Sequence, residues 1–90
     1  MIHINIDIDG IDYEKAVPVI VPLIISNPIA AKAAQLALLS KFKNKSQSER
    51  NAMFVNFINE HKNKIIKTCN EKVNENGTLG YLCNVSADMI

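Results

Sequence analysis

The segment 47–75 most constrains how this chain can fold, because its pattern predicts a helix that is longer than a compact domain of this size. Apolar residues recur there at spacings of three and four. The stripe contains Phe54, Phe57, Ile58, His61, Ile65 and Cys69. Such a helix measures about 40 Å, whereas a compact chain of 90 residues has a radius of gyration of about 12 Å. We therefore expect the helix to bend or to extend toward a partner chain.

The two ends of the chain have the pattern of half-buried strands. Isoleucine occupies every second position over 2–8, with polar residues between. Asp9 and Gly10 then supply a turn, and Asp12 can cap a following helix. Near the other end, LGYLCNVS over 79–86 also alternates, which predicts a second strand.

Two more helices are predicted between these ends. Residues 13–25 are apolar on nearly every side, and Pro18 and Pro22 remove two backbone donors. A bent, buried helix is favoured there, and an extended segment over 16–25 is the alternative, because the run is rich in β-branched residues. Asn-Pro at 27–28 forms a cap and first turn, which predicts a helix over 28–43.

These elements predict one small α+β domain over 1–90, in the order β-α-α-α-β, with the two terminal strands paired and covered by helices. The strands run parallel if three helices separate them, and antiparallel if the prolines remove one. Two strands form a poor sheet alone. We therefore expect a homodimer in which a second copy completes the sheet or the helix packing.

Composition and spacing argue against several classes of protein. The net charge of +1 is too small for a general nucleic-acid binder. Cys69 and Cys83 lack zinc-ligand spacing, so reduced thiols are expected. Lys32 is the only charge of the apolar stretch 16–39, and the uncharged run between Lys15 and Lys32 measures about 24 Å as a helix against a hydrocarbon thickness of about 30 Å, so we expect no membrane span. No signal-peptide pattern is present, so a cytoplasmic location is expected.

The stretch IDIDGID at 6–12 contains three closely spaced aspartates, a pattern that also occurs in active sites. It resembles the nucleophile motif of haloacid dehalogenase-like phosphatases, an apolar strand followed by Asp-x-Asp-Gly and then Thr or Val. The resemblance implies Asp7 as nucleophile and Asp9 as general acid. It covers about ten residues, places Ile11 after Gly10, and leaves no room for the Rossmann-like body of that family. We therefore expect a protein that is not an enzyme and holds no cofactor.

The same acidic stretch offers the weak candidates for a metal site. The stretch does not match an EF-hand calcium loop, because Gly10 is the fourth residue counted from Asp7, whereas the loop has its glycine at the sixth position. A looser metal site is the second alternative function, and a solvated strand face with a helix cap explains the same residues. The candidates are His3, Asp7, Asp9 and Asp12.

Basic residues flank the junction between the second and third predicted helices. They are Lys41, Lys43, Lys45 and Arg50. Ser46 starts a capping box with Glu49, which leaves amide donors near these charges, so the junction could contact a phosphate or a nucleic-acid backbone. A nucleic-acid-binding accessory protein is therefore the first alternative function.

The function predicted from these features is a small interaction or regulatory module that self-associates as a dimer, with a further protein partner possible. The apolar stripe of the long helix supplies the predicted contact surface. Its candidate residues are Phe54, Phe57, Ile58, His61 and Ile65. His61 is interpreted as an interface residue and Cys69 and Cys83 as inward-facing apolar residues.

Overall fold

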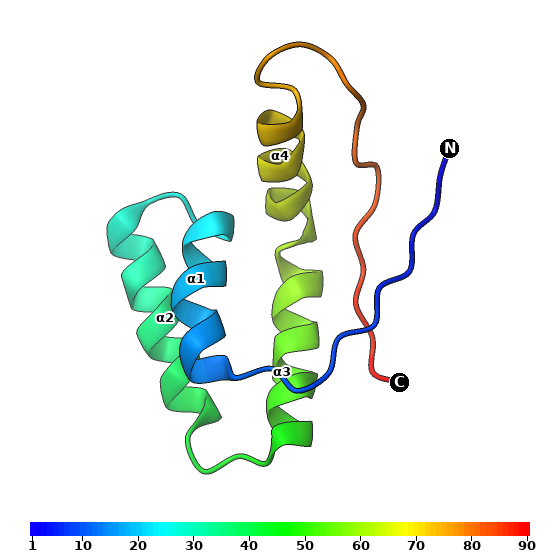
Figure 1. Ribbon diagram of the computed structural model, residues 1–90. Coiled ribbons are helices and arrows are strands. Elements are labelled where there is room, and N and C mark those ends of the chain that lie inside the picture. The colour runs from blue at the N-terminus through cyan, green and yellow to red at the C-terminus, as the bar shows by residue number, and fades with distance from the viewer.

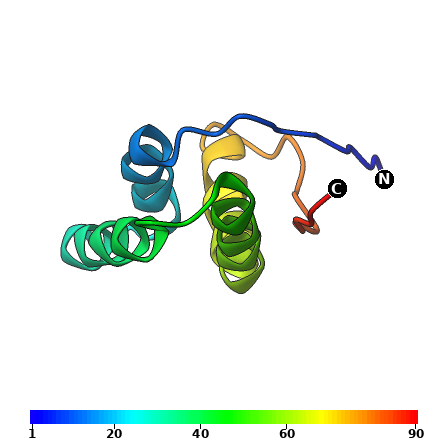
Figure 2. The same ribbon diagram turned by 90° about the horizontal axis from the view of Figure 1, so that it is seen from below.

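The computed structural model describes residues 1–90 and contains four helices and no strand (Figure 1). The helices are α1 (Tyr13–Ile24), α2 (Pro28–Phe42), α3 (Gln47–Glu60) and α4 (Lys62–Val73). α1 and α2 lie side by side, and α3 and α4 follow one another in a column beside them. Seen from below, this column separates α2 from the two chain ends (Figure 2). None of the four helices has the length and apolar character needed to cross a bilayer.

The predicted α+β fold with two paired strands is wrong. Residues 2–8 and 79–86 form no strand, and the four isoleucines of the first segment are between 73 and 88 % exposed. A lone two-stranded ribbon is marginal in water. Moreover, backbone groups of the second segment that would pair with a strand bind the side chains of Asn70 in α4 and Asn74, which follows α4. The alternating pattern therefore marks segments that lack a strand partner within this chain.

The open question over 16–25 is resolved in favour of a helix. The Asp12 side chain caps α1 by accepting from the Lys15 backbone N–H. Pro18 and Pro22 lie inside α1, and both are exposed. The buried residues of α1 fall at spacings of four, four and three, so one face packs inward while the prolines occupy another. They are Tyr13, Val17, Val21 and Ile24.

The long helix predicted over 47–75 is divided at His61, whose φ of −108° and ψ of 13° depart from helical geometry. The His61 Nδ1 atom lies 2.9 Å from the Phe57 carbonyl oxygen, which also accepts from the His61 backbone N–H. A side chain that shares the i−4 carbonyl competes with the helical bond and favours a bend. The helix therefore bends, and α4 ends at Val73, two residues before the predicted end.

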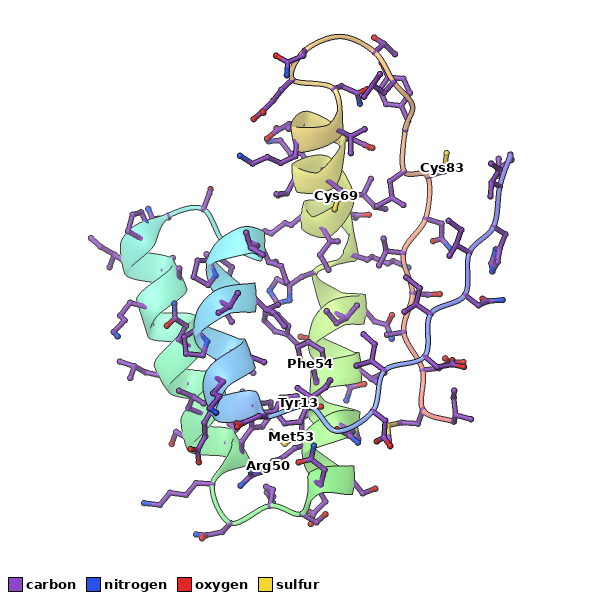
Figure 3. The ribbon with its side chains drawn as sticks, viewed as in Figure 1. Tyr13, Arg50, Met53, Phe54, Cys69 and Cys83 are labelled. Atoms are coloured by element: carbon purple, nitrogen blue, oxygen red, sulfur yellow. The ribbon has the colours of Figure 1, made fainter.

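The core formed by these helices is small. Its seven buried residues are Tyr13, Val17, Val21, Ile24, Ala31, Phe42 and Phe57. The Tyr13 ring packs edge-on against Phe42 at 5.0 Å and against Phe54 at 5.5 Å between centroids (Figure 3). Its hydroxyl donates to Asn51 Oδ1 at 2.6 Å, and burial raises the pKa of Tyr13. The radius of gyration, 14.2 Å, exceeds the value of about 12 Å for a compact chain, so the fold is open.

Candidate functional site

The four metal candidates of the N-terminal stretch do not converge. His3 Nε2 hydrogen-bonds to Asn5 Oδ1 at 2.9 Å, and Asp9 Oδ1 accepts from the Gly10 backbone N–H. Asp12 caps α1 and lies 3.9 Å from Lys15 Nζ. Asp7 is exposed. No group of three His, Cys, Asp or Glu side chains in the chain is arranged to hold a metal ion.

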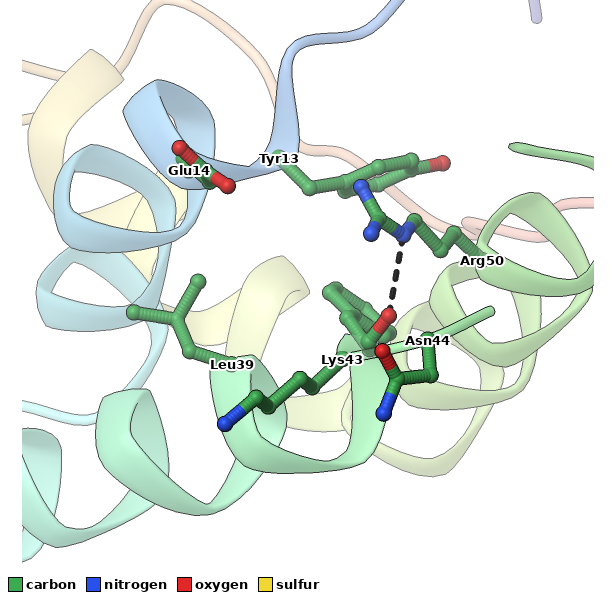
Figure 4. A pocket seen from close by; sticks show the side chains of 7 residues that line it. Tyr13, Glu14, Leu39, Lys43, Asn44 and Arg50 are labelled. Atoms are coloured by element: carbon green, nitrogen blue, oxygen red, sulfur yellow. Dashed lines mark hydrogen bonds between the residues drawn. The ribbon is translucent and has the colours of Figure 1, made fainter. Parts of the chain in front are cut away.

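The basic residues of the α2–α3 junction also face different surroundings. Lys43 and Arg50 line one hollow of about 620 Å³, which they share with Glu14 (Figure 4). Arg50 Nε donates to the Phe42 carbonyl at 3.0 Å, which fixes the guanidinium at the edge of this hollow. Lys41 lines a second hollow of about 340 Å³. Lys45 lies 3.8 Å from the Glu49 carboxylate. The junction therefore presents separate cations instead of one basic patch.

The capping box at the start of α3 gives the junction a pH dependence. The Ser46 backbone N–H donates to Glu49, and Glu49 N–H donates to the Ser46 hydroxyl. The hydrogen bond from the Ser46 backbone, followed by that of its side chain, lowers the pKa of Glu49 below its ordinary value of 4.5. A depressed carboxyl pKa adds stability above the unfolded pKa, and this stability is lost as pH falls through the folded pKa.

We therefore expect the urea midpoint of the wild type to fall as the pH is lowered below about 4.5. Glu49→Gln is the matched variant, because glutamine also serves in a capping box but does not titrate. Its midpoint should fall less over the same acid range. Urea unfolding followed by circular dichroism measures both curves, and parallel acid losses would contradict the assignment to Glu49.

The aromatic stripe predicted for self-association lies against the molecule's own core. Phe57 is buried, and its ring contacts the His61 ring at 4.3 Å between centroids. Phe54, Ile58 and Ile65 are partly buried against the same core. The stripe is therefore largely covered within one chain.

Three asparagines, one in α3, one in α4 and one directly after α4, form the most organised polar feature of the chain. We call Asn59, Asn70 and Asn74 the asparagine ladder. Asn70 Nδ2 donates to the Leu82 carbonyl at 3.1 Å, and Asn70 Oδ1 accepts from the Leu82 N–H at 2.6 Å. Asn59 makes the same pair of bonds with Ala87, at 2.8 and 3.0 Å.

Asn74 completes the ladder at the far end of α4. Its Nδ2 donates to the Gly80 carbonyl at 2.9 Å, and its Oδ1 accepts from the N–H groups of Leu79 at 2.8 Å and Gly80 at 3.3 Å. A side-chain amide has one donor face and one acceptor face, like a peptide group. The ladder therefore binds the segment 79–87, hereafter the tail, as a neighbouring strand would.

The spacing of the ladder matches the rise of an extended chain. Eleven residues separate Asn59 from Asn70, about 16 Å along a helix, and five separate Leu82 from Ala87, about 16 Å in an extended segment. Asn74 lies four residues after Asn70, a rise of about 6 Å along a helix. Their partners Gly80 and Leu82 are two residues apart, about 7 Å in an extended segment. Each asparagine therefore meets a backbone residue at its own height.

Sequence reasoning missed this site and assigned the cysteines wrongly. Cys69 in α4 and Cys83 in the tail are exposed free thiols, not inward-facing residues (Figure 3). Cys83 is exposed because the tail does not pair as a strand, and Cys69 lies in a helix none of whose residues is buried. The signal for the ladder was the recurrence of asparagine at spacings of eleven and four on one helix face. Comparison with protein-family models, curated proteins and solved structures finds no match to this chain.

Proposed function

We propose that this chain is a non-enzymatic interaction module that self-associates through the apolar surface its small core leaves exposed. The accessible surface is 6982 Å², whereas a compact monomer of 10.0 kDa has about 5,200 Å². The excess of about 1,700 Å² is about twice the area that one partner contributes to a standard interface, about 800 Å². This excess is the observation that carries the proposal.

The N-terminal arm, residues 2–8, supplies the densest part of that surface. Four large aliphatic side chains occur in seven residues, and each is at least 73 % exposed. Burying an isoleucine side chain stabilises an assembly by about 1.5–3 kcal/mol. An apolar surface of this kind on a monomer is typical of a protein-interaction site.

The docking site we assign to the arm is the hollow between α2 and α3 of a second copy. Apolar residues line it, among them Ala34, Leu38, Met53 and Phe57, and its lining also includes one cation, Lys41, and one carboxylate, Glu60. The arm carries Asp7 next to its isoleucines, and neither Asp7 nor Lys41 forms an ion pair within its own chain. The apolar lining of the hollow matches the exposed isoleucines of the arm, and Lys41 can pair with Asp7, so we assign a second copy as the occupant.

Sedimentation of paired variants tests this proposal. The double substitution Ile4→Asn and Ile6→Asn removes two apolar contacts from each arm and should raise the dimer dissociation constant at least about a hundredfold. Leu79→Asn is the matched control, since Leu79 is 82 % exposed and lies outside the arm. It should leave the dissociation constant unchanged.

A charge exchange tests the assigned docking site. Asp7→Lys alone should weaken the dimer, and adding Lys41→Asp should restore much of its affinity, because the two charges then attract again. Independent effects of the two substitutions would place the arm elsewhere. A weakening by Leu79→Asn equal to that of the arm variant would contradict the role of the arm.

A further inference from the structure

We propose that the asparagine ladder is a binding site for the main chain of an extended peptide, and that the tail is a displaceable occupant built into the chain. The ligand is an extended polypeptide segment in trans. This site is separate from the apolar hollow and uses the other side of the α3–α4 column, where the tail runs (Figures 1 and 2).

The ladder recognises backbone and not side chains. All seven of its hydrogen bonds to the tail end on backbone N–H or C=O groups. The Leu79 and Tyr81 side chains, by contrast, are 82 and 68 % exposed. The ligand requirement is therefore an extended conformation with N–H groups free at the positions of residues 79, 80, 82 and 87. Proline is excluded at those positions because it has no N–H.

The tail is held in a way that permits exchange. Most of the ladder bonds are exposed, and within the tail only Val85 and Ala87 are partly buried. The tail joins α4 through a short turn containing Gly77, whose φ of 127° is a conformation that glycine tolerates. A segment with few apolar contacts opens locally at low cost. An incoming extended segment can then make the same bonds.

The covalent attachment of the tail to α4 determines how competition between the tail and a free peptide can be measured. A covalently attached tail acts at an effective concentration in the millimolar range, so it competes strongly with a free peptide. We therefore weaken the tail and leave the ladder intact. The double substitution Leu82→Pro and Ala87→Pro removes two backbone N–H groups that donate to Asn70 and Asn59, and it changes no ladder residue.

The probe is a fluorescent peptide with the sequence of residues 78–90, carrying Cys83→Ser, and binding is read as anisotropy. The full-length double-proline chain should bind this peptide about tenfold or more tightly than the wild-type chain does, because its own tail no longer competes. Adding Asn70→Ala to that chain should remove the binding. Circular dichroism verifies that each variant retains its helices.

Two peptide variants distinguish recognition of the peptide backbone from recognition of its side chains. A peptide with proline at positions 82 and 87 should not bind, whereas one with Leu79→Ser and Tyr81→Ser should bind as the parent does. No binding to a folded double-proline chain would overturn the proposal and leave the tail as an intramolecular strap. A larger loss from the serine changes than from the prolines would also overturn it. Neither result depends on the oligomeric state, so the proposed function is tested separately.

Discussion

Replacing Phe42 with alanine is expected to lower the free energy of unfolding by about 3–5 kcal/mol. Phe42 is 2 % exposed at the end of α2 and packs edge-on against Tyr13. Removing its ring leaves a cavity in a core of only seven residues. Few other buried contacts remain to compensate for the lost packing. Domains of this size are stable by about 5–15 kcal/mol, so the loss is a large fraction of the total.

Tyr81→Ala is the control for this experiment, because it removes an aromatic ring of similar size that is 68 % exposed in the tail. Its effect should be within about 0.5 kcal/mol. Urea unfolding at dilute protein concentration measures both variants, so that self-association does not contribute. A loss below about 1 kcal/mol for Phe42→Ala would show that this packing is not the core.

Replacing Pro18 with alanine is expected to stabilise the chain by about 2–3 kcal/mol. Proline at the sixth position of α1 donates no hydrogen bond to the Glu14 carbonyl, and its ring crowds that carbonyl. Pro18 is exposed, so the change removes little packing. The greater freedom of alanine in the unfolded chain offsets part of the gain.

Pro28→Ala provides the matched comparison within the neighbouring helix. Pro28 occupies the first position of α2, directly after the Asn27 cap, where proline has no intrahelical bond to make. Its replacement should leave stability unchanged or slightly lower. Thermal unfolding measures both variants. Equal effects at the two positions would contradict a helical α1 across Pro18.

The helices follow from the sequence because their start signals are local. Asp12, Asn27 and Ser46 each accept hydrogen bonds from the first turn that they precede, as their spacing predicts. The bend at His61 was foreseen only as a requirement of length. Its position depends on one histidine side chain that shares the Phe57 carbonyl, which periodicity does not show.

The absence of strands and the presence of the ladder could not be predicted for a related reason. Alternation indicates that a segment has two different faces, but it does not identify what binds its backbone. In the tail, side chains of Asn59, Asn70 and Asn74 take the place of a neighbouring strand. Each of those asparagines taken alone is typical of a polar surface. Their shared role becomes visible only when their spacing along the helix is compared with the spacing of residues in the extended tail.

In the assembly that we propose, a second copy covers the N-terminal arm, and the solvent exposure of the isoleucine methyl groups of the arm tests this contact most directly. The measurement is the relaxation caused by a soluble paramagnetic agent in isoleucine-methyl-labelled protein over a dilution series. We expect the methyl groups of Ile2, Ile4, Ile6 and Ile8 to relax as exposed groups when the protein is dilute and to become protected as its concentration rises. Ile29, 83 % exposed on α2, lies outside the assigned contact and should change less. Unchanged exposure of the arm at every concentration, in a sample that sediments as a monomer, would contradict the proposed assembly.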